Sequence, residues 1–314
     1  MSTEAMPERP EMDFTLVRNG MDYLTSAVLY LTGKIQVPME AGSLWPEAAK
    51  HPRFSQPAPL WTSDRHLKYG VLHLHAAVEV LLKARLVREH WSLVFKDLRN
   101  ATRSAYESGD FDSCSTTAAL DRLANIVGVP ITAKERTAIS NLSKTRNALM
   151  HFGHKANAYA VEARTAEVLS FLIDFVPRHL QPNLSSEAAE VDRSMEAVRR
   201  RLRDIEVFVR KREQDLADEL DQAAERTVHC PSCRRIALVV GEMPVSCRFC
   251  QRTFATPTAA AIAYWHDVLD EEDTVGLQDC GACGQDSLML VTTRADPRED
   301  VALCFHCGAV YTRK

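Results

Sequence analysis

Apolar side chains recur at helical spacing along the first half of the chain. In residues 11–33 they stand three or four positions apart, which places them on one face of a helix. The intervening residues 36–61 contain five prolines and predict a long loop. A longer helix is predicted from Asp64 to Trp91, where six side chains form one stripe: Leu67, Val71, Leu74, Val78, Leu81 and Arg85.

Three further helices are predicted, over 116–127, 132–151 and 157–176. Thr132 and Glu135 form a capping box, in which each side chain would bond to the other residue's amide at the start of a helix. Gly153 is expected to end that helix, and Pro177 the next one. Together these segments predict a mainly α fold, with a helical bundle over residues 11–180.

Residues 185–227 predict a different kind of helix, a long one of the coiled-coil type. Its apolar positions alternate between steps of four and three, which is a heptad seam: Val191, Met195, Val198, Leu202, Ile205 and Val209. Arg212 interrupts the seam, and most other side chains in the segment are charged. Such a stripe needs a partner. We expect a second subunit, and hence a homodimer; the alternative is a single long helix lying along its own domain.

Eight of the nine cysteines lie in four Cys-x-x-Cys pairs near the end of the chain. They are Cys230, Cys233, Cys247, Cys250, Cys280, Cys283, Cys304 and Cys307. Four thiolates suit closed tetrahedral zinc, and the stretches Ile236–Val240 and Leu288–Thr292 between the pairs favour β-strands. We therefore predict two small β-rich zinc ribbons, ribbon 1 over 228–256 and ribbon 2 over 277–314, joined by a connecting helix or linker over 257–276.

Two structural Zn²⁺ ions are the expected cofactors. No catalytic metal is expected, because a site closed by four thiolates has no open position. Iron of the rubredoxin kind uses the same ligands, and disulfides are the alternative without metal. His229 and His306 adjoin the cysteines but are surplus to the four ligands, and Cys114 is expected to be a buried thiol.

Charge narrows the possible partners. The formal net charge of −4 argues against a sequence-blind coat for nucleic acid, although it leaves room for a nuclease with a local cationic site. Ribbon 1 has four arginines against Glu242, whereas acids outnumber bases in ribbon 2. Ribbon 1 could therefore touch phosphates, while ribbon 2 is expected to face protein or to be purely structural. The four arginines are Arg234, Arg235, Arg248 and Arg252.

Composition indicates a soluble globular protein, with 46% hydrophobic and 25% charged residues. The first residues lack the apolar core of a signal peptide, and no apolar run approaches the length of a membrane span. We therefore expect a cytoplasmic protein, in which paired cysteines remain reduced and bind metal.

The segment from Lys144 to His151 carries further candidate chemistry. Asn147 and His151 are four positions apart, so they share a helix face. Arg146 lies about 140° around the helix from His151, but its long side chain can reach a ligand held over that face. A cation, an amide and an imidazole together predict a phosphate site with a group that titrates near neutral pH.

This arrangement resembles the motif of the HEPN family of ribonucleases, in which arginine and a polar residue precede a histidine near the end of a helix. The segment from His73 to Arg85 is similar to the family's second helix, which commonly carries an acidic residue at the position of Glu79. The resemblance covers residues 11–180. Glu79 could instead form a salt bridge with Lys83, four positions further on.

The resemblance implies a metal-independent endoribonuclease. The 2′-hydroxyl of RNA would attack the adjacent phosphodiester, giving a cyclic 2′,3′-phosphate, and DNA would be spared because it lacks that hydroxyl. His151 would transfer a proton, and Arg146 would stabilise charge on the phosphorus. Asn147 would orient the histidine or a phosphate oxygen, and Glu79 would hold Arg146 or assist proton transfer.

The family further implies a dimer whose two motifs face one cleft, and a role in bacterial stress or antiviral defence, often as a toxin. Gly153 stands where some family toxins carry a tyrosine that a partner antitoxin modifies with nucleotides. Three other histidines are expected at the surface or in an interface: His73, His75 and His154. The competing function is a non-catalytic adaptor, in which the bundle dimerises and the ribbons bind nucleic acid or a partner protein.

Overall fold

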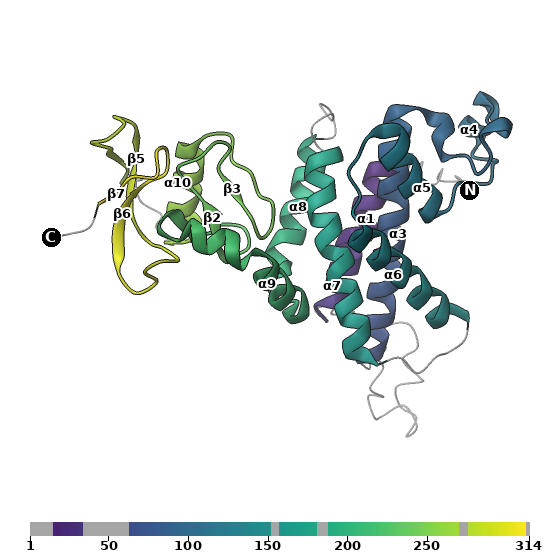
Figure 1. Cartoon of the computed structure of the whole chain (residues 1–314), viewed down its shortest axis with the longest axis horizontal. Helices are drawn as coiled ribbons and strands as arrows, with labels where there is room; N and C mark the ends of the chain where they lie inside the picture. Colours follow the sequence, from purple (N-terminus) through teal and green to yellow (C-terminus); the bar gives the residue numbers. More distant parts are fainter. Residues whose placement is uncertain (1–14, 34–62, 152–156, 181–187, 270–275, 312–314) are drawn as a thin grey trace, which may run out of the picture.

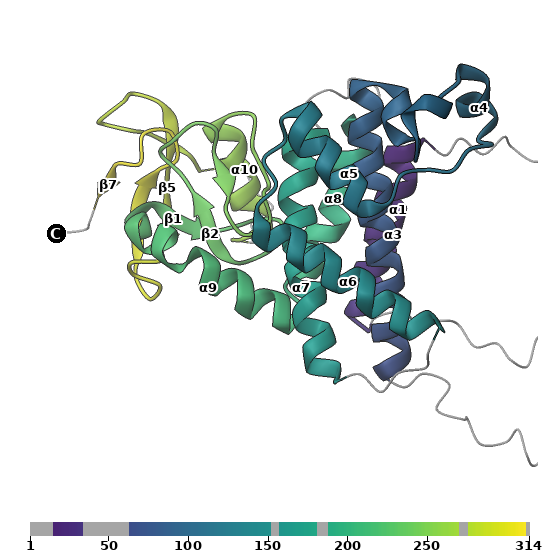
Figure 2. The same ribbon diagram turned by 45° about the vertical axis from the view of Figure 1, so that its right-hand side comes forward.

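A computed structural model describes residues 15–33, 63–151, 157–180, 188–269 and 276–311. Helices form one end of the elongated molecule, and two small antiparallel sheets form the other (Figures 1 and 2). The predicted mainly helical chain with two small β-rich modules is therefore confirmed. The predicted loop over 36–61, the helix stop at Gly153 and the histidine at position 154 lie outside the described residues.

Helix α3 (Ser63–Glu89) is at the centre of the bundle. It packs against α1 (Leu16–Leu31), α6 (Ala133–His151) and α7 (Ala158–Phe175). Full burial of one leucine or valine side chain stabilises a fold by about 1.5–3 kcal/mol. The predicted stripe is the main apolar contribution of α3, because four of its members have no exposed surface: Val71, Leu74, Val78 and Leu81.

The start of α6 is capped as its sequence predicts. A carboxylate oxygen of Glu135 accepts a hydrogen bond from the Thr132 amide at 2.7 Å, and the Thr132 hydroxyl accepts one from the Glu135 amide at 3.2 Å. Helix α7 ends at Phe175, before Pro177, but the chain continues through a π-helical turn, Val176–Leu180. The wider turn accommodates a proline, which has no amide hydrogen to donate.

Short helices connect α3 to α6. The segment predicted over 116–127 is α5 (Thr116–Arg122), followed by a π-helical turn, Leu123–Val127. Three elements before it were not predicted, namely the 3-10 turns Trp91–Val94 and Leu98–Asn100 and helix α4 (Arg103–Ser108). Ring packing organises this region: Phe95 stacks on Phe111 with a centroid separation of 4.1 Å. Contacts between rings produce no regular spacing of apolar residues along the sequence, so these elements could not be predicted from periodicity.

The helix predicted over 185–227 is two helices, α8 (Ala188–Leu202) and α9 (Glu206–Gln222), so the prediction of one continuous helix is wrong. Residues 203–205 include neither glycine nor proline, so local preference does not cause the break. Packing does, because α8 lies against α1 while α9 lies against α7. The seam is buried within this one chain and gives no argument for a second subunit: Val191, Met195, Val198 and Leu202 are at most 3% exposed.

Both β-prone stretches form strands. Ribbon 1 has three antiparallel strands, β1 (Thr227–His229), β2 (Ile236–Val239) and β3 (Ser246–Cys247). Helix α10 (Pro257–Asp267) follows, in the predicted connecting segment, and packs on β5 of ribbon 2. Ribbon 2 has four antiparallel strands in sequence order, β4 (Gln278–Asp279), β5 (Asp286–Thr292), β6 (Asp300–Cys304) and β7 (Val310–Tyr311).

The two ribbons dock against each other through their backbones. The Gly241 amide donates to the Phe305 carbonyl at 3.1 Å, and the Arg294 amide donates to the Thr227 carbonyl at 2.8 Å. The backbones also meet at Gly241 (φ 77°) and Gly308 (φ 74°), where a Cβ added to Gly241 would lie 2.5 Å from the Gly308 Cα. Only glycine fits at this contact.

Replacing Gly241 with alanine is expected to destabilise the ribbon pair by about 2–4 kcal/mol, because the new methyl group meets backbone and the residue keeps a positive φ. Gly284→Ala is the matched control. Gly284 also has a positive φ (69°), but among the described residues nothing lies within 4 Å of its added Cβ, so it should cost only about 1 kcal/mol. Thermal unfolding would measure both, and equal losses would contradict this docking.

Candidate functional site

The cysteines of ribbon 1 come together as predicted. Their four Sγ atoms lie within 4.8 Å of one another, and the Sγ–Sγ distance is 3.8 Å for both Cys230–Cys250 and Cys233–Cys247. Zinc–sulfur bonds of about 2.3 Å give a tetrahedron with edges of about 3.8 Å, so the four thiols fit zinc. A disulfide bond would be about 2.05 Å, so these cysteines are not paired as disulfides.

Ribbon 2 repeats this geometry. The Sγ–Sγ distance is 3.7 Å for Cys280–Cys307 and for Cys283–Cys304. Both groups of candidate ligands consist of cysteines alone, so His229 and His306 remain neighbours of the sites, as predicted. The bound metal would cross-link each ribbon, and zinc as its identity stays a prediction because iron accepts the same ligands.

All four Cys-x-x-Cys loops share one backbone conformation. In each loop, the residue after the second cysteine donates its amide to the carbonyl of the first cysteine, at 2.7–2.9 Å. That residue has a positive φ, and the repeated turn aims both sulfurs of a loop toward one point. The four residues are Arg234 (φ 61°), Gln251 (φ 57°), Gly284 (φ 69°) and Gly308 (φ 74°).

Arg234→Gly is expected to stabilise ribbon 1 by about 0.5–1 kcal/mol, because glycine adopts a positive φ without the Cβ clash that arginine meets. Gln251→Gly should gain less, because it also removes the hydrogen bond from Nε2 of Gln251 to the carbonyl of Arg248, 3.0 Å away. Thermal unfolding of the zinc-loaded protein would measure both. A lower melting temperature for Arg234→Gly would show that this position carries no backbone strain.

Solvent access distinguishes the two metal sites. Every cysteine of ribbon 1 is fully buried, whereas Cys307 of ribbon 2 is exposed and Cys283 is half-buried. The Tyr311 hydroxyl lies 3.4 Å from Sγ of Cys280 and lowers the pKa of that thiol to about 6. Ribbon 2 is therefore the site more open to water and chelators. The remaining cysteine, Cys114, is a buried thiol as predicted, and burial raises its pKa.

The candidate motif of the helical bundle lies at the end of α6. Arg146 and Asn147 are joined directly, with Nη1 of Arg146 donating to Oδ1 of Asn147 at 2.9 Å. His151 is the last residue of α6, and both it and Asn147 are exposed. The cation and the amide therefore form one polar group open to solvent, with the imidazole one turn further along.

Glu79 forms the salt bridge that its spacing allows. Its carboxylate lies 2.6 Å from the Lys83 ammonium, which also donates to the Ser113 hydroxyl at 2.8 Å. The Lys83 side chain is only 10% exposed, so Glu79 neutralises an almost buried charge. Among the described residues, no hydrogen bond or ion pair joins Glu79 to Arg146. Glu79 therefore pairs with Lys83 in this structure and does not hold Arg146.

His75 is an additional member of this polar region. Its Nε2 lies 3.1 Å from the Ser143 hydroxyl on α6, so it faces the helix that carries Arg146. Burial is the main cause that lowers the pKa of His75. Arg146 and Lys83 lower it further, and Glu79 opposes them. The imidazole is therefore neutral near pH 7 and able to accept a proton.

His75 lies at the interface of α3 and α6, in keeping with the predicted surface or interface position, but the sequence did not single it out as a neighbour of the candidate motif. Its spacing did link it to Glu79, because His75, Glu79 and Lys83 follow each other at intervals of four and so share a face of α3. His73 has the expected interface position on the opposite side, where its Nδ1 lies 2.7 Å from the hydroxyl of Ser26 on α1.

Three of the four ribbon 1 arginines pair with acids on the helices. Arg235 lies 3.2 Å from Glu213, Arg248 lies 2.6 Å from Glu219, and Arg252 lies 3.5 Å from Asp192. These arginines therefore attach ribbon 1 to α8 and α9. Arg234 is exposed.

The chain was compared with protein-family models, with curated proteins and with solved structures, and none of them matches it. None of the described helices combines the length and apolar character that crossing a membrane requires.

Proposed function

We propose that this protein is a metal-independent endoribonuclease of the HEPN type, whose reaction centre is the polar face shared by α3 and α6. The observation that carries the proposal is the contact of His75 on α3 with Ser143 of α6, about one turn before Arg146 and Asn147 and two turns before His151. This face provides a phosphate-binding cation and two imidazoles. Those groups suffice for cleavage by the substrate's own 2′-hydroxyl.

In the proposed reaction the 2′-oxygen forms a bond to phosphorus as the bond to the 5′-oxygen breaks. His75, neutral near pH 7, accepts the proton of the 2′-hydroxyl, and His151 donates a proton to the departing 5′-oxygen. Arg146, steadied by Asn147, stabilises the negative charge on the phosphoryl oxygens. The products are a cyclic 2′,3′-phosphate and a 5′-hydroxyl, and the proposed setting is bacterial stress or antiviral defence.

The direct test uses the zinc-loaded protein with single-stranded RNA and with DNA of the same sequence, without added divalent metal. Cleavage of RNA alone, with cyclic phosphate ends, supports the proposal. A brief EDTA treatment should leave the activity intact while the zinc content, measured in the same sample, stays constant. Intact RNA across a range of pH values would overturn the ribonuclease proposal.

The pH dependence of cleavage is expected to reveal His75. As a base it must be neutral, and its pKa is lowered from the ordinary value of 6.5, so the acidic limb of the kcat/KM profile should lie below pH 6.5. His75→Asn should lower the rate and remove this acidic limb. If the limb persists unchanged in His75→Asn, another group is the base.

A protein-binding adaptor is the second candidate, and a feature of ribbon 2 favours it. Leu290, Ala302 and Tyr311 are cross-strand neighbours on β5, β6 and β7. Leu290 is 45% exposed and Tyr311 is 39% exposed, so the row presents apolar surface at the end of the molecule opposite the bundle. The adaptor function is supported if wild-type protein leaves RNA intact and Leu290→Asp abolishes binding of a partner protein.

A further inference from the structure

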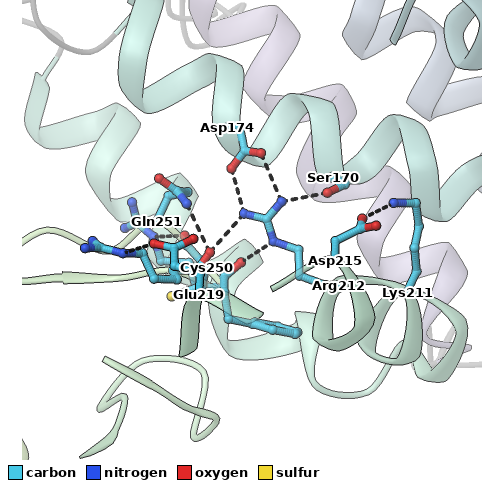
Figure 3. Close-up of polar contacts among 11 residues, drawn as sticks. Ser170, Asp174, Lys211, Arg212, Asp215, Glu219, Cys250 and Gln251 are labelled. Carbon is cyan, nitrogen blue, oxygen red and sulfur yellow. Dashed lines mark hydrogen bonds and ion pairs between the residues drawn. The ribbon is translucent and has the colours of Figure 1, made fainter. Parts of the chain in front are cut away.

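A buried arginine of α9 joins the helical bundle to ribbon 1 (Figure 3). Arg212 is 5% exposed, and its guanidinium donates to both carboxylate oxygens of Asp174, at 2.6 and 3.0 Å, and to the hydroxyl of Ser170, at 2.6 Å. On its other side it donates to the carbonyls of Phe249, at 2.8 Å, and Arg248, at 3.0 Å. Arg212 therefore connects α7 to the second cysteine loop of ribbon 1.

A second buried arginine reaches the same loop from α8. Arg199 is 1% exposed, and its Nε donates to the carbonyl of Cys250 at 3.3 Å. Its Nη1 lies 3.6 Å from Asp192 and 3.8 Å from Glu196, which balance its charge without a hydrogen bond to Nη1. Three consecutive carbonyls of one cysteine loop, at 248–250, therefore accept hydrogen bonds from two buried guanidinium groups.

These hydrogen bonds depend on the shape of the loop. Removing hydrogen-bond acceptors from a buried guanidinium is strongly destabilising, because its charge then has fewer partners away from water. A cysteine loop keeps its turn when both of its thiolates are bound to the metal, because small ribbons fold together with metal binding. Without the metal, the carbonyls at 248–250 would lose their fixed positions, and Arg199 and Arg212 would be left buried with fewer partners.

We propose that the metal bound by ribbon 1 is a structural element of the helical bundle, coupled to it through Arg212 and Arg199. Loss of this metal loosens the packing of α7 and α9, and loss of either arginine in turn weakens retention of the metal. The residues fit this role because the four thiols have zinc geometry and the carbonyls between them already bind the helices.

Helix α7 also contacts α6. Ser170 and Asp174, which bind Arg212, lie on α7. Nearer the start of the same helix, Nη1 of Arg164 donates to the hydroxyl of Thr145 on α6, at 3.0 Å. Thr145 is buried and directly precedes Arg146. A change in α7 that follows loss of the metal would therefore act on a helix that is hydrogen-bonded to α6 next to Arg146.

Ribbon 2 provides an internal comparison. Its cysteine loop at 304–308 docks on ribbon 1 through Gly308, and toward α9 it forms a partly exposed ion pair, Arg294 with Asp221 at 2.7 Å. An exposed ion pair contributes about 0–1 kcal/mol. Loss of the ribbon 2 metal should therefore affect the helices much less than loss of the ribbon 1 metal.

The experiment measures metal release from the full chain in a Cys307→Ser background, which leaves ribbon 1 as the single intact site. With zinc loaded and a colorimetric chelator in excess, Arg212→Met is expected to speed zinc release at least about tenfold. Arg210→Met, an exposed charge on the same helix, is the matched control and should leave the rate unchanged. Equal release rates for Arg212→Met and the background would overturn the proposal.

A second measurement needs no substitution of the buried arginine and therefore does not depend on whether Arg212→Met folds. Hydrogen exchange of the α7 and α9 amides is compared between loaded and chelator-stripped protein, with Cys307→Ser as the protein that lacks only the ribbon 2 metal. Protection should fall when ribbon 1 is stripped and persist in loaded Cys307→Ser. Unchanged protection after stripping would overturn the coupling. Neither readout involves RNA, so the result is independent of the proposed reaction.

Discussion

Replacing His151 with alanine is expected to slow RNA cleavage by about 10²–10⁴-fold, because no other group would protonate the leaving 5′-oxygen. Since His151 is exposed at the end of α6, the substitution should leave the melting temperature unchanged. Single-turnover cleavage of a labelled oligonucleotide would measure the loss. A substrate with a better leaving group than a 5′-alkoxide should be cleaved by His151→Ala at a nearly restored rate, because it needs no proton donor.

Arg146→Ala should lower the same rate by about 10²–10³-fold through lost stabilisation of the phosphoryl charge, and Arg146→Lys should recover part of it. The matched controls are His266→Ala and Arg193→Ala, which remove an exposed imidazole from α10 and an exposed guanidinium from α8. Retained cleavage in both His151→Ala and Arg146→Ala, beside active controls, would move the reaction to another part of the molecule.

Replacing Cys233 with serine is expected to remove one of the two metal ions and to unfold ribbon 1. A structural zinc site contributes about 10–16 kcal/mol of apparent binding free energy, far more than a three-stranded sheet of this size can replace. Metal analysis should find the zinc content of the chain halved. Cys114→Ser is the matched control, because Cys114 is also buried but belongs to neither group, and its zinc content should be that of the wild type.

If Cys233→Ser kept the full zinc content, three thiolates would be enough to retain the metal in ribbon 1, and binding would not require all four cysteines. Partial proteolysis distinguishes local from global unfolding in this variant. New cleavage sites within 228–256 would indicate that ribbon 1 unfolds, additional sites in α7 or α9 would indicate that the helices loosen with it, and a pattern identical to that of the wild type would argue against a folding role for the metal.

Much of the fold was predictable because its elements rest on local periodicity. The stripe of α3, the capping box at Thr132 and the spacing of the cysteines each specify a local geometry that tertiary contacts then preserve. The division between α8 and α9 was not predictable in this way. Its heptad pattern is continuous, and the break arises because the two halves pack on different helices.

The metal ligands could be predicted from the sequence more fully than the helical site could. Cys-x-x-Cys pairs constrain their own geometry, whereas a role for His75 depends on α6 lying next to α3, which no spacing within α3 reveals. Arg212 shows the same limit: the sequence marks it only as an interruption of an apolar seam. Its partners lie on α7 and in ribbon 1, at sequence separations of 36 to 42 residues.

The contact between Gly241 and Gly308 also restricts how this sequence can evolve. The two residues lie in different ribbons, yet a Cβ added to Gly241 would lie 2.5 Å from the Gly308 Cα, and one added to Gly308 would lie 3.2 Å from the Gly241 Cα. A lineage that substituted one of them would have to separate the ribbons first, through changes at several hydrogen-bonded positions. We therefore expect the two glycines to be retained or lost together among descendants of this chain, as an inherited pair.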